Sequence, residues 1–453
     1  MVSFYKPPKK DRNTHVAFEL TIDSLDLLGR GVGRRDGKVY FVPGLLPNES
    51  ARVLFKANKG SATEVSVTKI LSKSPLRQES DCAISERCGG CPLMFIPKKM
   101  SFEAKQNGLC RLFNKSFNLS IKEPDFTIES DDIHYRRACR LALRVDHGIL
   151  HLGFRAKKSH DLVPVSECNV LTRRLNDLLN PLCECLSSLD LRHKIGHVEL
   201  LDGSKIVGVL LRMTSVLNKS DETKLKDFAQ KHSLVISAVE PYKPVVSLQK
   251  DEECVKERLI AGNLDDLYIV SSGVKINCLP SSFVQVNESV NLKLVEKIIE
   301  LVEPKPDMRI LDLFCGLGNF TLPLAKSGSE VYGVDIVREM VLKARENALR
   351  AGLLTAHFAS ANLSEPFENQ TFAQGNFDAA VLDPGRSGAP YATAFLAKKK
   401  VPKIIMISCN PQAAARDAVE LLKAKYKIVN FGVVDMFPRT SHIETVLMFE
   451  RMK

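Results

Sequence analysis

The sequence has no tryptophan and only eight tyrosines, so its 22 phenylalanines are the main side chains able to stack on a nucleic-acid base. No apolar segment of signal-peptide length follows Met1, and no stretch reaches the uncharged length of a membrane span. We therefore expect a cytoplasmic protein with no membrane partner. In that compartment its 12 cysteines should be reduced, bound to metal or catalytic rather than paired in disulfides.

Two common nucleotide-binding motifs are also absent. The chain has no Gly-Lys-Ser/Thr phosphate loop. Its glycine-rich segment, Met308-Arg-Ile-Leu-Asp-Leu-Phe-Cys-Gly-Leu-Gly-Asn-Phe-Thr321, has Thr321 in place of the third glycine of the dinucleotide fingerprint. These absences argue against a P-loop nucleotidase and against a dehydrogenase that uses NAD.

The composition is that of an ordinary globular protein with a basic excess. Its 453 residues are too many for one compact core, so two or three domains are expected. Lysine and arginine number 64 against 53 acidic residues, a net charge of +11, which favours a polyanionic partner and nucleic acid first. The alternative is a basic surface with no specific partner.

Changes of pattern along the chain predict a multidomain α/β protein with three domains. Residues 1–76 begin with a basic arm over residues 1–12 and continue as short alternating runs, which indicates a small OB-like β-barrel. Residues 77–280 mix short strands with short helices, as in an α+β domain. Residues 281–453 alternate strands with helices, the pattern of a Rossmann-like sheet.

A cysteine-rich loop opens the second segment. Cys82-Ala-Ile-Ser-Glu-Arg-Cys88-Gly-Gly-Cys91-Pro92 places three thiols within ten residues, and this spacing is typical of a metal site. An all-sulfur zinc site or an iron–sulfur cluster needs a fourth thiolate. We favour Cys168, in a polar and loop-like stretch, over the other candidates, which are Cys110, Cys139, Cys183, Cys185, Cys254 and Cys278. The spacing alone leaves zinc and iron–sulfur open.

Basic and apolar residues are interspersed in the segment 135–145, Tyr-Arg-Arg-Ala-Cys-Arg-Leu-Ala-Leu-Arg-Val, and Lys157 and Lys158 follow soon after. On a strand this pattern puts several guanidinium groups within reach of one another, which suits phosphate contacts. A solvated strand face explains the same pattern equally simply.

The third segment places polar residues at the ends of its expected strands. The strand before Phe314 enters a glycine turn, which lets a cofactor approach main-chain amides. The next strand ends in Asp335, an acid able to accept both hydroxyls of a ribose, and Asn362 and Asp383 follow later strands. Without a pyrophosphate fingerprint, an adenosine cofactor such as S-adenosylmethionine fits better than NAD.

Cys409 follows an apolar run of strand length, 403–408, and precedes a helix-like segment, 412–425. A thiol at the carboxyl end of a buried strand lies where open α/β sheets present their chemistry, and near a basic group it can be a thiolate nucleophile. The alternative is a cysteine that fills the core. Glu444 stands at the start of the last expected strand, 443–450, and is either a base or a solvated strand-end acid.

Two sets of motifs resemble known families. An RNA-binding barrel, the TRAM domain, is similar to Asp23-Ser-Leu-Asp-Leu-Leu-Gly-Arg-Gly-Val-Gly33, Gly37-Lys-Val-Tyr-Phe-Val-Pro-Gly44 and Leu46-Pro-Asn-Glu49. The RNA uracil-5-methyltransferase family is similar to Phe283-Val-Gln-Val-Asn287, Leu311-Asp-Leu-Phe-Cys-Gly-Leu-Gly-Asn-Phe-Thr321, Leu382-Asp-Pro-Gly-Arg-Ser-Gly388, Ser408-Cys-Asn-Pro411 and Asp435-Met-Phe-Pro-Arg-Thr-Ser-His-Ile-Glu444. With the TRAM-like segment and the cysteine loop, the resemblance is to members that act on 23S ribosomal RNA.

This resemblance implies a role for each matching residue. Cys409 would be the nucleophile, Glu444 the base that removes the C5 proton, and Phe283 a neighbour of the target base. The S-adenosyl-L-methionine site of a class I methyltransferase domain would be lined by Gln285, Phe314, Asn319, Asp335, Asn362 and Asp383. A [4Fe-4S] cluster in the central domain would be held by Cys82, Cys88, Cys91 and Cys168. The partner would be 23S ribosomal RNA, bound by a monomer at an unpaired or flipped uridine.

The expected chemistry needs a thiol and a carboxylate together. C5 of uracil is a poor nucleophile, so a thiolate first adds to C6, and C5 then takes the methyl group from the sulfonium. A base must remove the C5 proton before the thiol leaves. RNA cytosine-5 methyltransferases share the thiol addition but use Thr-Cys-Ser and Pro-Cys motifs, which the chain lacks. A non-catalytic iron–sulfur RNA-binding protein is the other alternative, and the presence of both Cys409 and Glu444 argues against it.

Overall fold

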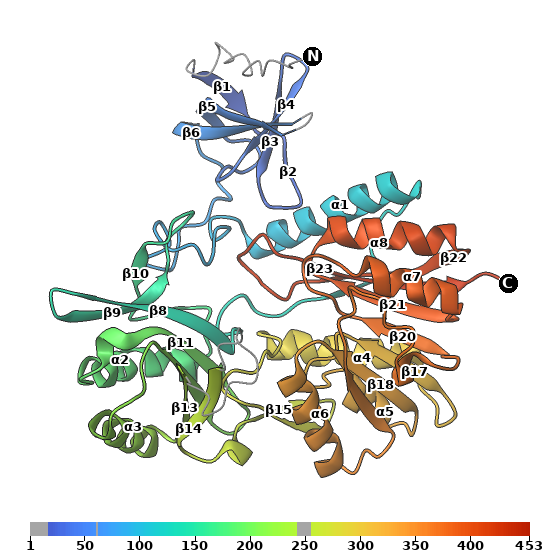
Figure 1. Ribbon diagram of the computed structural model, residues 1–453. Helices are drawn as coiled ribbons and strands as arrows, with labels where there is room; N and C mark the ends of the chain where they lie inside the picture. The colour runs from blue at the N-terminus through green and yellow to red at the C-terminus, as the bar shows by residue number, and fades with distance from the viewer. Residues whose placement is uncertain (1–16, 60–61, 242–254) are drawn as a thin grey trace, which may run out of the picture. The chain divides into compact units, whose positions relative to one another are not determined.

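The computed structural model in Figure 1 describes residues 17–59, 62–241 and 255–453. The predicted basic arm, residues 1–12, and Cys254 lie outside the described residues. Contacts group the chain into two compact units. The first comprises residues 1–80, 91–111 and 439–441, and the second comprises residues 81–90, 112–438 and 442–453. The three-domain division predicted above is finer than this grouping and stays a prediction.

The first unit is built on a six-stranded sheet in the order β1-β5-β6-β4-β3-β2 (Figure 1). Apolar residues alternate along these strands, and Leu20, Val42 and Val53 are buried together on one side. The strands are β1 (Phe18–Thr21), β2 (Ser24–Leu25), β3 (Gly31–Arg35), β4 (Lys38–Val42), β5 (Ser50–Lys59) and β6 (Ala62–Ser72). Helix α1 (Lys98–Phe117) follows them in the chain.

The second unit contains a seven-stranded sheet in the order β10-β9-β8-β11-β12-β13-β14. Helices α2 (Arg173–Ser187) and α3 (Lys219–His232) cover one face, because their leucines pack with the buried strand residues Leu141, Val198 and Leu211. The strands are β8 (Ala138–Asp146), β9 (Ile149–Arg155), β10 (Leu162–Pro164), β11 (Ile195–Asp202), β12 (Val207–Met213), β13 (Leu234–Pro241) and β14 (Val255–Ala261).

An eight-stranded sheet in the order β19-β18-β17-β20-β21-β23-β22-β7 forms the rest of this unit. From β17 the chain adds β18 and β19 on one side and then β20 and β21 on the other, all in parallel. Such a reversal of strand order creates the crevice in which open α/β sheets bind ligands. Strand β23 runs antiparallel between β21 and β22, and β7, from before the seven-stranded sheet in the chain, joins as an edge strand beside β22.

The strands of this sheet are β7 (Phe126–Ile128), β17 (Arg309–Leu313), β18 (Glu330–Asp335), β19 (Ala356–Ser360), β20 (Ala379–Leu382), β21 (Lys403–Ser408), β22 (Tyr426–Val434) and β23 (Glu444–Arg451). Its helices are α4 (Glu288–Val302), α5 (Thr321–Ala325), α6 (Arg338–Arg350), α7 (Pro390–Lys399) and α8 (Pro411–Lys423). In the described ranges, no helix combines the length and the apolar composition needed to cross a membrane.

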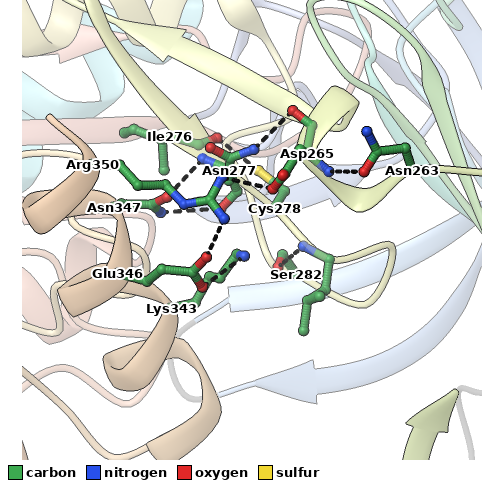
Figure 2. A network of polar contacts seen from close by, with 11 residues as sticks. Asn263, Asp265, Ile276, Asn277, Cys278, Ser282, Lys343, Glu346, Asn347 and Arg350 are labelled. Atoms are coloured by element: carbon green, nitrogen blue, oxygen red, sulfur yellow. Dashed lines mark hydrogen bonds and ion pairs between the residues drawn. The ribbon is translucent and has the colours of Figure 1, made fainter. Parts of the chain in front are cut away.

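A hairpin of β15 (Tyr268–Ser271) and β16 (Val274–Asn277) is held on α6 by polar contacts, which Figure 2 shows. Asn277 and Asn347 are buried and exchange two hydrogen bonds, from Asn277 N to Asn347 Oδ1 (2.9 Å) and from Asn347 Nδ2 to Asn277 O (3.1 Å). Arg350 forms ion pairs with Asp265 (2.6 Å) and Glu346 (2.7 Å). These contacts fix the hairpin, which forms one wall of the pocket described next.

Candidate active site

The thiol of Cys409 and the carboxyl group of Glu444 come from neighbouring strands. β21 and β23 are antiparallel, and Ser408 pairs with Thr445 at the end of their ladder. Continuing this register by one residue brings Cys409 opposite Glu444. Both residues lie at the carboxyl end of β21, the edge at which open α/β sheets bind their ligands.

Glu444 is buried in an acidic environment. The residue is 6% exposed, and its Oε2 has no hydrogen-bond partner among the described residues. Burial raises the pKa of Glu444 to about 8, and the negative charges of Asp383 and Asp435 contribute to the rise. Burial also raises the pKa of Asp383. A carboxylate with so high a pKa is a stronger base than one in water.

The half-buried thiol of Cys409 experiences charges of both signs. Burial raises the pKa of Cys409, and Glu444 and Asp383 raise it further, whereas the guanidinium of Arg386 lowers it. Arg386 is therefore a cation that stabilises the thiolate. No role was predicted for Arg386 from the sequence, although its position three residues after Asp383, in the motif Leu382-Asp-Pro-Gly-Arg-Ser-Gly388, was a signal for one.

The loop that carries Arg386 is tied to the start of α8. Asn410 caps this helix, because its Oδ1 accepts from the main-chain N–H groups of Gln412 (3.2 Å) and Ala413 (3.5 Å). Its Nδ2 donates to Arg386 O at 2.8 Å. Pro411 begins the helix at a position where a missing N–H removes no helical hydrogen bond. The segment Ser408–Pro411 thus positions both the thiol of Cys409 and the loop that carries Arg386.

A pocket lies between the glycine turn after β17 and the hairpin β15–β16. Gly316 and Gly318 have φ angles of 54° and 89°, which glycine adopts without strain. A Cβ at Gly316 would meet no atom within 4 Å, so this peptide faces open space. The lining residues are Ile269, Ile276, Phe283, Val284, Gln285, Phe314, Cys315, Gly316, Leu317, Asn319, Phe320 and Asp383.

Most of the residues predicted for the cofactor and the target base are in this lining. Phe283 is 70% exposed, so its ring is available for stacking. Gln285 donates from Nε2 to Asp383 Oδ2 at 3.3 Å. Asn319 exchanges two hydrogen bonds of 2.9 Å with Asn291, so its amide is held by a buried neighbour that the sequence analysis did not single out.

Asp335 and Asn362 are not among the lining residues in the described part of the chain. Asp335 ends β18 and accepts hydrogen bonds from Gly316 N (3.0 Å) and Val337 N (2.9 Å), so it lies at the edge of the glycine turn. Each of its oxygens keeps a lone pair for a ribose hydroxyl. Asn362 follows Ala361, whose N–H donates to Asp335 O at 3.0 Å, which places Asn362 beside the same edge.

Asp312, next to the glycine turn, is a buried carboxyl group that the sequence analysis also missed. It is fully buried on β17, accepts a hydrogen bond from Thr321 Oγ1, and has an Oδ1 without a partner among the described residues. Burial raises the pKa of Asp312 to about 7, and the charges of Asp383 and Asp335 add to the rise. The bond to Thr321 joins β17 to α5 and so shapes the turn between them.

The predicted metal ligands divide between the two units. Cys82, Cys88 and Cys168 belong to the second unit and Cys91 to the first. Burial raises the pKa values of Cys88 and Cys168, and the charges of Cys82 and Cys88 also raise that of Cys168, so these three thiols lie within electrostatic reach of one another. Within the described ranges, no group of three or more His, Cys, Asp or Glu side chains is arranged to hold a metal ion.

Comparisons with known proteins show the family to which the chain is similar. The model of the tRNA (uracil-5-)-methyltransferase family matches residues 98–452. The 23S rRNA (uracil(1939)-C(5))-methyltransferase RlmD of Shewanella sp. (strain W3-18-1) is 36% identical, with 100% of both chains covered. The protein of that name from Shewanella frigidimarina is 37% identical, over 99% of this chain and 98% of its own. A solved structure, the tRNA (uracil-54, C5)-methyltransferase of Pyrococcus abyssi with S-adenosyl-L-homocysteine, is 25% identical with a TM-score of 0.70, over 95% of this chain and 99% of that one.

Proposed function

Because this chain belongs to the tRNA (uracil-5-)-methyltransferase family, we propose that it methylates C5 of a uridine in 23S ribosomal RNA, with S-adenosyl-L-methionine as the methyl donor. Similarity over the whole length to relatives named for 23S rRNA supports the RNA class. The eight-stranded sheet is that of a class I methyltransferase fold. The observation that best supports this reaction is the β21–β23 ladder, which ends at the pair Ser408–Thr445, so that Cys409 and Glu444 are the next residues on the two strands. An enzyme with this substrate would work in the cytoplasm.

The residues of the pocket suit S-adenosyl-L-methionine by their chemistry. The open peptide at Gly316 and the carboxylate of Asp335 offer polar contacts for an adenosine moiety, and Phe314 adds an apolar surface. Asp383 places a negative charge in the lining, where it favours a cation. When bound, the cofactor supplies an electrophilic methyl group on a positively charged sulfur.

Cys409 would begin the reaction by adding to C6 of the target uracil. As a thiolate, its Sγ forms a bond to C6 while the electron pair of the C5–C6 double bond moves toward C5 and the O4 carbonyl. Arg386 favours this step because its charge lowers the pKa of Cys409 against the opposing effect of burial. C5, now electron-rich, would form the new carbon–carbon bond to the methyl group, whose bond to the sulfonium sulfur breaks, so that the cofactor leaves as the neutral thioether S-adenosyl-L-homocysteine.

Glu444 would complete the reaction as the base. After methyl transfer, C5 carries both the methyl group and its original hydrogen. Glu444 takes that proton, the C–H electron pair restores the C5–C6 double bond, and the bond from Cys409 to C6 breaks. Burial and the neighbouring carboxylates make Glu444 basic enough for this transfer. Phe283, exposed in the pocket lining, would stack on the uracil once it has left its own stack.

Outside the methyltransferase fold, we assign two further parts. The six-stranded sheet of the first unit would be a TRAM-like RNA-binding barrel. A [4Fe-4S] cluster would be held by Cys82, Cys88, Cys91 and Cys168. Support for it comes from the donor chemistry: three of these thiols lie within electrostatic reach of one another, and a bound metal would displace their protons and offset the repulsion between the resulting thiolates. Cys91 joins them through its sequence position, three residues after Cys88.

Anaerobic purification followed by iron and sulfide analysis tests the cluster. We expect about four iron and about four sulfide per chain, as in a cluster bound by four cysteines. The Cys88→Ser variant should lose both and their visible absorption. Zinc in a one-to-one ratio, or protein free of metal and sulfide, would contradict the assignment without affecting the methylation proposal.

The test of the function is a nucleoside analysis. The purified protein is incubated with a 23S rRNA transcript and methyl-labelled S-adenosyl-L-methionine, and the RNA is digested. The label is expected in 5-methyluridine, whereas label in 5-methylcytidine would favour the cytosine-5 alternative. Cys409→Ala and Glu444→Ala should abolish methylation and spare RNA binding. Methylation by Cys409→Ala would refute the mechanism, and a wild-type protein that binds both RNA and cofactor without methylating would refute the function.

A further inference from the structure

The seven-stranded sheet carries a group of charged residues on the face away from α2 and α3. Side chains alternate between the two faces of a strand, and the residues buried against the helices include Leu141, Val198 and Leu211. Their neighbours in the chain, Arg140 and Arg212, point the other way. The strand pairing sets Arg140 on β8 opposite Glu199 on β11, and Arg212 on β12 opposite His197 on β11.

A fourth strand adds Arg155, and we call Arg140, Arg155, His197, Glu199 and Arg212 the arginine face. One Arg155 guanidinium nitrogen lies 3.5 Å from His197 Nε2, and another donates to a main-chain carbonyl. Glu199 Oε1 lies 2.6 Å from Arg212 Nε and 3.6 Å from Arg140 Nε. The single carboxylate therefore orients two guanidinium groups and neutralises at most one of them.

The pKa of His197 indicates that the guanidinium groups lie close to its imidazole ring. The pKa of His197 is lowered, first by burial and then by the charges of Arg140, Arg155 and Arg212. Three guanidinium groups thus act on one imidazole, and Glu199 is the carboxylate that opposes them. Arg140 is 56% exposed at its side chain and Arg212 38%, so the excess positive charge is open to a ligand.

The arrangement of guanidinium groups on the arginine face is suited to binding phosphate groups. Guanidinium groups bind phosphate oxygens through paired N–H donors, and exposed guanidinium groups spread over several strands suit an extended polyanion better than a small molecule. Strands in a sheet are about 4.8 Å apart, so four adjacent strands spread the arginines over roughly 14 Å. A distance of this size spans several consecutive phosphates of a single RNA strand. The chain's own net charge of +11 is in keeping with such a partner.

We propose that the arginine face binds backbone phosphates of the RNA substrate and positions that RNA without reading its sequence. The inference rests on the proposed function for its choice of polyanion. Phosphate contacts orient a nucleic acid and carry no base information, so they act on RNA affinity and leave the chemical step unchanged.

The experiment measures RNA affinity of the full-length protein against salt concentration. Removing one phosphate-binding side chain lowers the slope of log K against log salt by about 0.7 to 0.9. We expect Arg140→Ala/Arg155→Ala to lower the slope by about 1 to 2 and to weaken binding about tenfold at low salt. KM for RNA should rise by a similar factor, with kcat at saturating RNA unchanged.

Three further variants separate charge from structure. Glu199→Gln removes the opposing carboxylate, so it should tighten RNA binding and steepen the salt slope. Arg155→Lys keeps the charge and should keep most of the slope. Lys231 lies on α3, which packs on the other face of the sheet. Lys231→Ala should therefore leave both the RNA affinity and the salt slope unchanged. Thermal unfolding of each variant confirms that the fold is retained.

Two results would overturn the inference. One is an Arg140→Ala/Arg155→Ala protein that binds RNA with the slope and affinity of Lys231→Ala. The other is weakened binding by Glu199→Gln, because that would make the contacts structural rather than electrostatic. Failure of the proposed function looks different: the wild-type protein would then bind RNA with a salt dependence set by these residues and yet produce no 5-methyluridine.

Discussion

Replacing Glu444 with glutamine is expected to stop turnover and, at neutral pH, to stabilise the fold. Burial raises the pKa of Glu444 from 4.5 to about 8. The native state then holds a proton that the unfolded state has lost, so stability falls as pH rises from about 4.5 to about 8. One pKa unit corresponds to about 1.4 kcal/mol, which sets the loss at pH 7 at about 3 kcal/mol. Glutamine does not ionise in this pH range, so the Glu444→Gln variant does not lose this folding stability as the pH rises.

Urea unfolding at pH 5, 6, 7 and 8 measures the effect. The stability difference between Glu444→Gln and the wild type should be small at pH 5 and grow to about 3 kcal/mol by pH 7. Glu365→Gln is the matched control, because Glu365 is exposed and should show no such growth. A difference for Glu444→Gln that stays constant with pH would mean that Glu444 titrates normally, and the reasoning about its burial would be wrong.

Three other predictions follow from the site. Cys409→Ser should lose methylation at least about a hundredfold, because a hydroxyl is a much weaker nucleophile at neutral pH, while cofactor binding measured by calorimetry stays intact. Arg386→Ala should raise the pKa of Cys409, so its activity should fall most at neutral pH and recover in part at higher pH, and a uniform loss across a pH–rate profile would count against this role. Asn347→Leu breaks both hydrogen bonds to Asn277 and should weaken S-adenosyl-L-methionine binding about tenfold by loosening the hairpin wall, whereas an unchanged Kd would show that the hairpin does not depend on them.

Much of the fold could be predicted from local pattern. The helix expected at 412–425 is observed at Pro411–Lys423, and the strand expected to end in Asp335 is observed at Glu330–Asp335. The amphipathic period and the capping residue Asn410 determine such elements locally. The addition of β7 to the far edge of the eight-stranded sheet could not be predicted, because it depends on a pairing with β22 about 300 residues later in the chain.

The candidate site was predictable in its motifs and not in its electrostatics. Phe283, Gln285 and Asp383 stand in motifs, and the structure places all three in one pocket lining. Asp312 and Arg386 also stand in motifs, but their importance comes from burial and from charges brought near by the fold. A sequence shows which side chains are acidic or basic. It does not show which of them are buried next to one another in the folded protein.

The proposed mechanism depends on a covalent bond between Cys409 and the RNA, and this bond can be trapped. RNA containing 5-fluorouridine cannot lose a proton from C5, so the reaction should stop after methyl transfer. Denaturing mass spectrometry of the protein after incubation with this RNA and S-adenosyl-L-methionine is expected to show a protein–RNA adduct that carries one added methyl group and maps to Cys409. Absence of an adduct, with RNA and cofactor binding confirmed, or an adduct that persists in Cys409→Ala, would show that Cys409 is not the nucleophile.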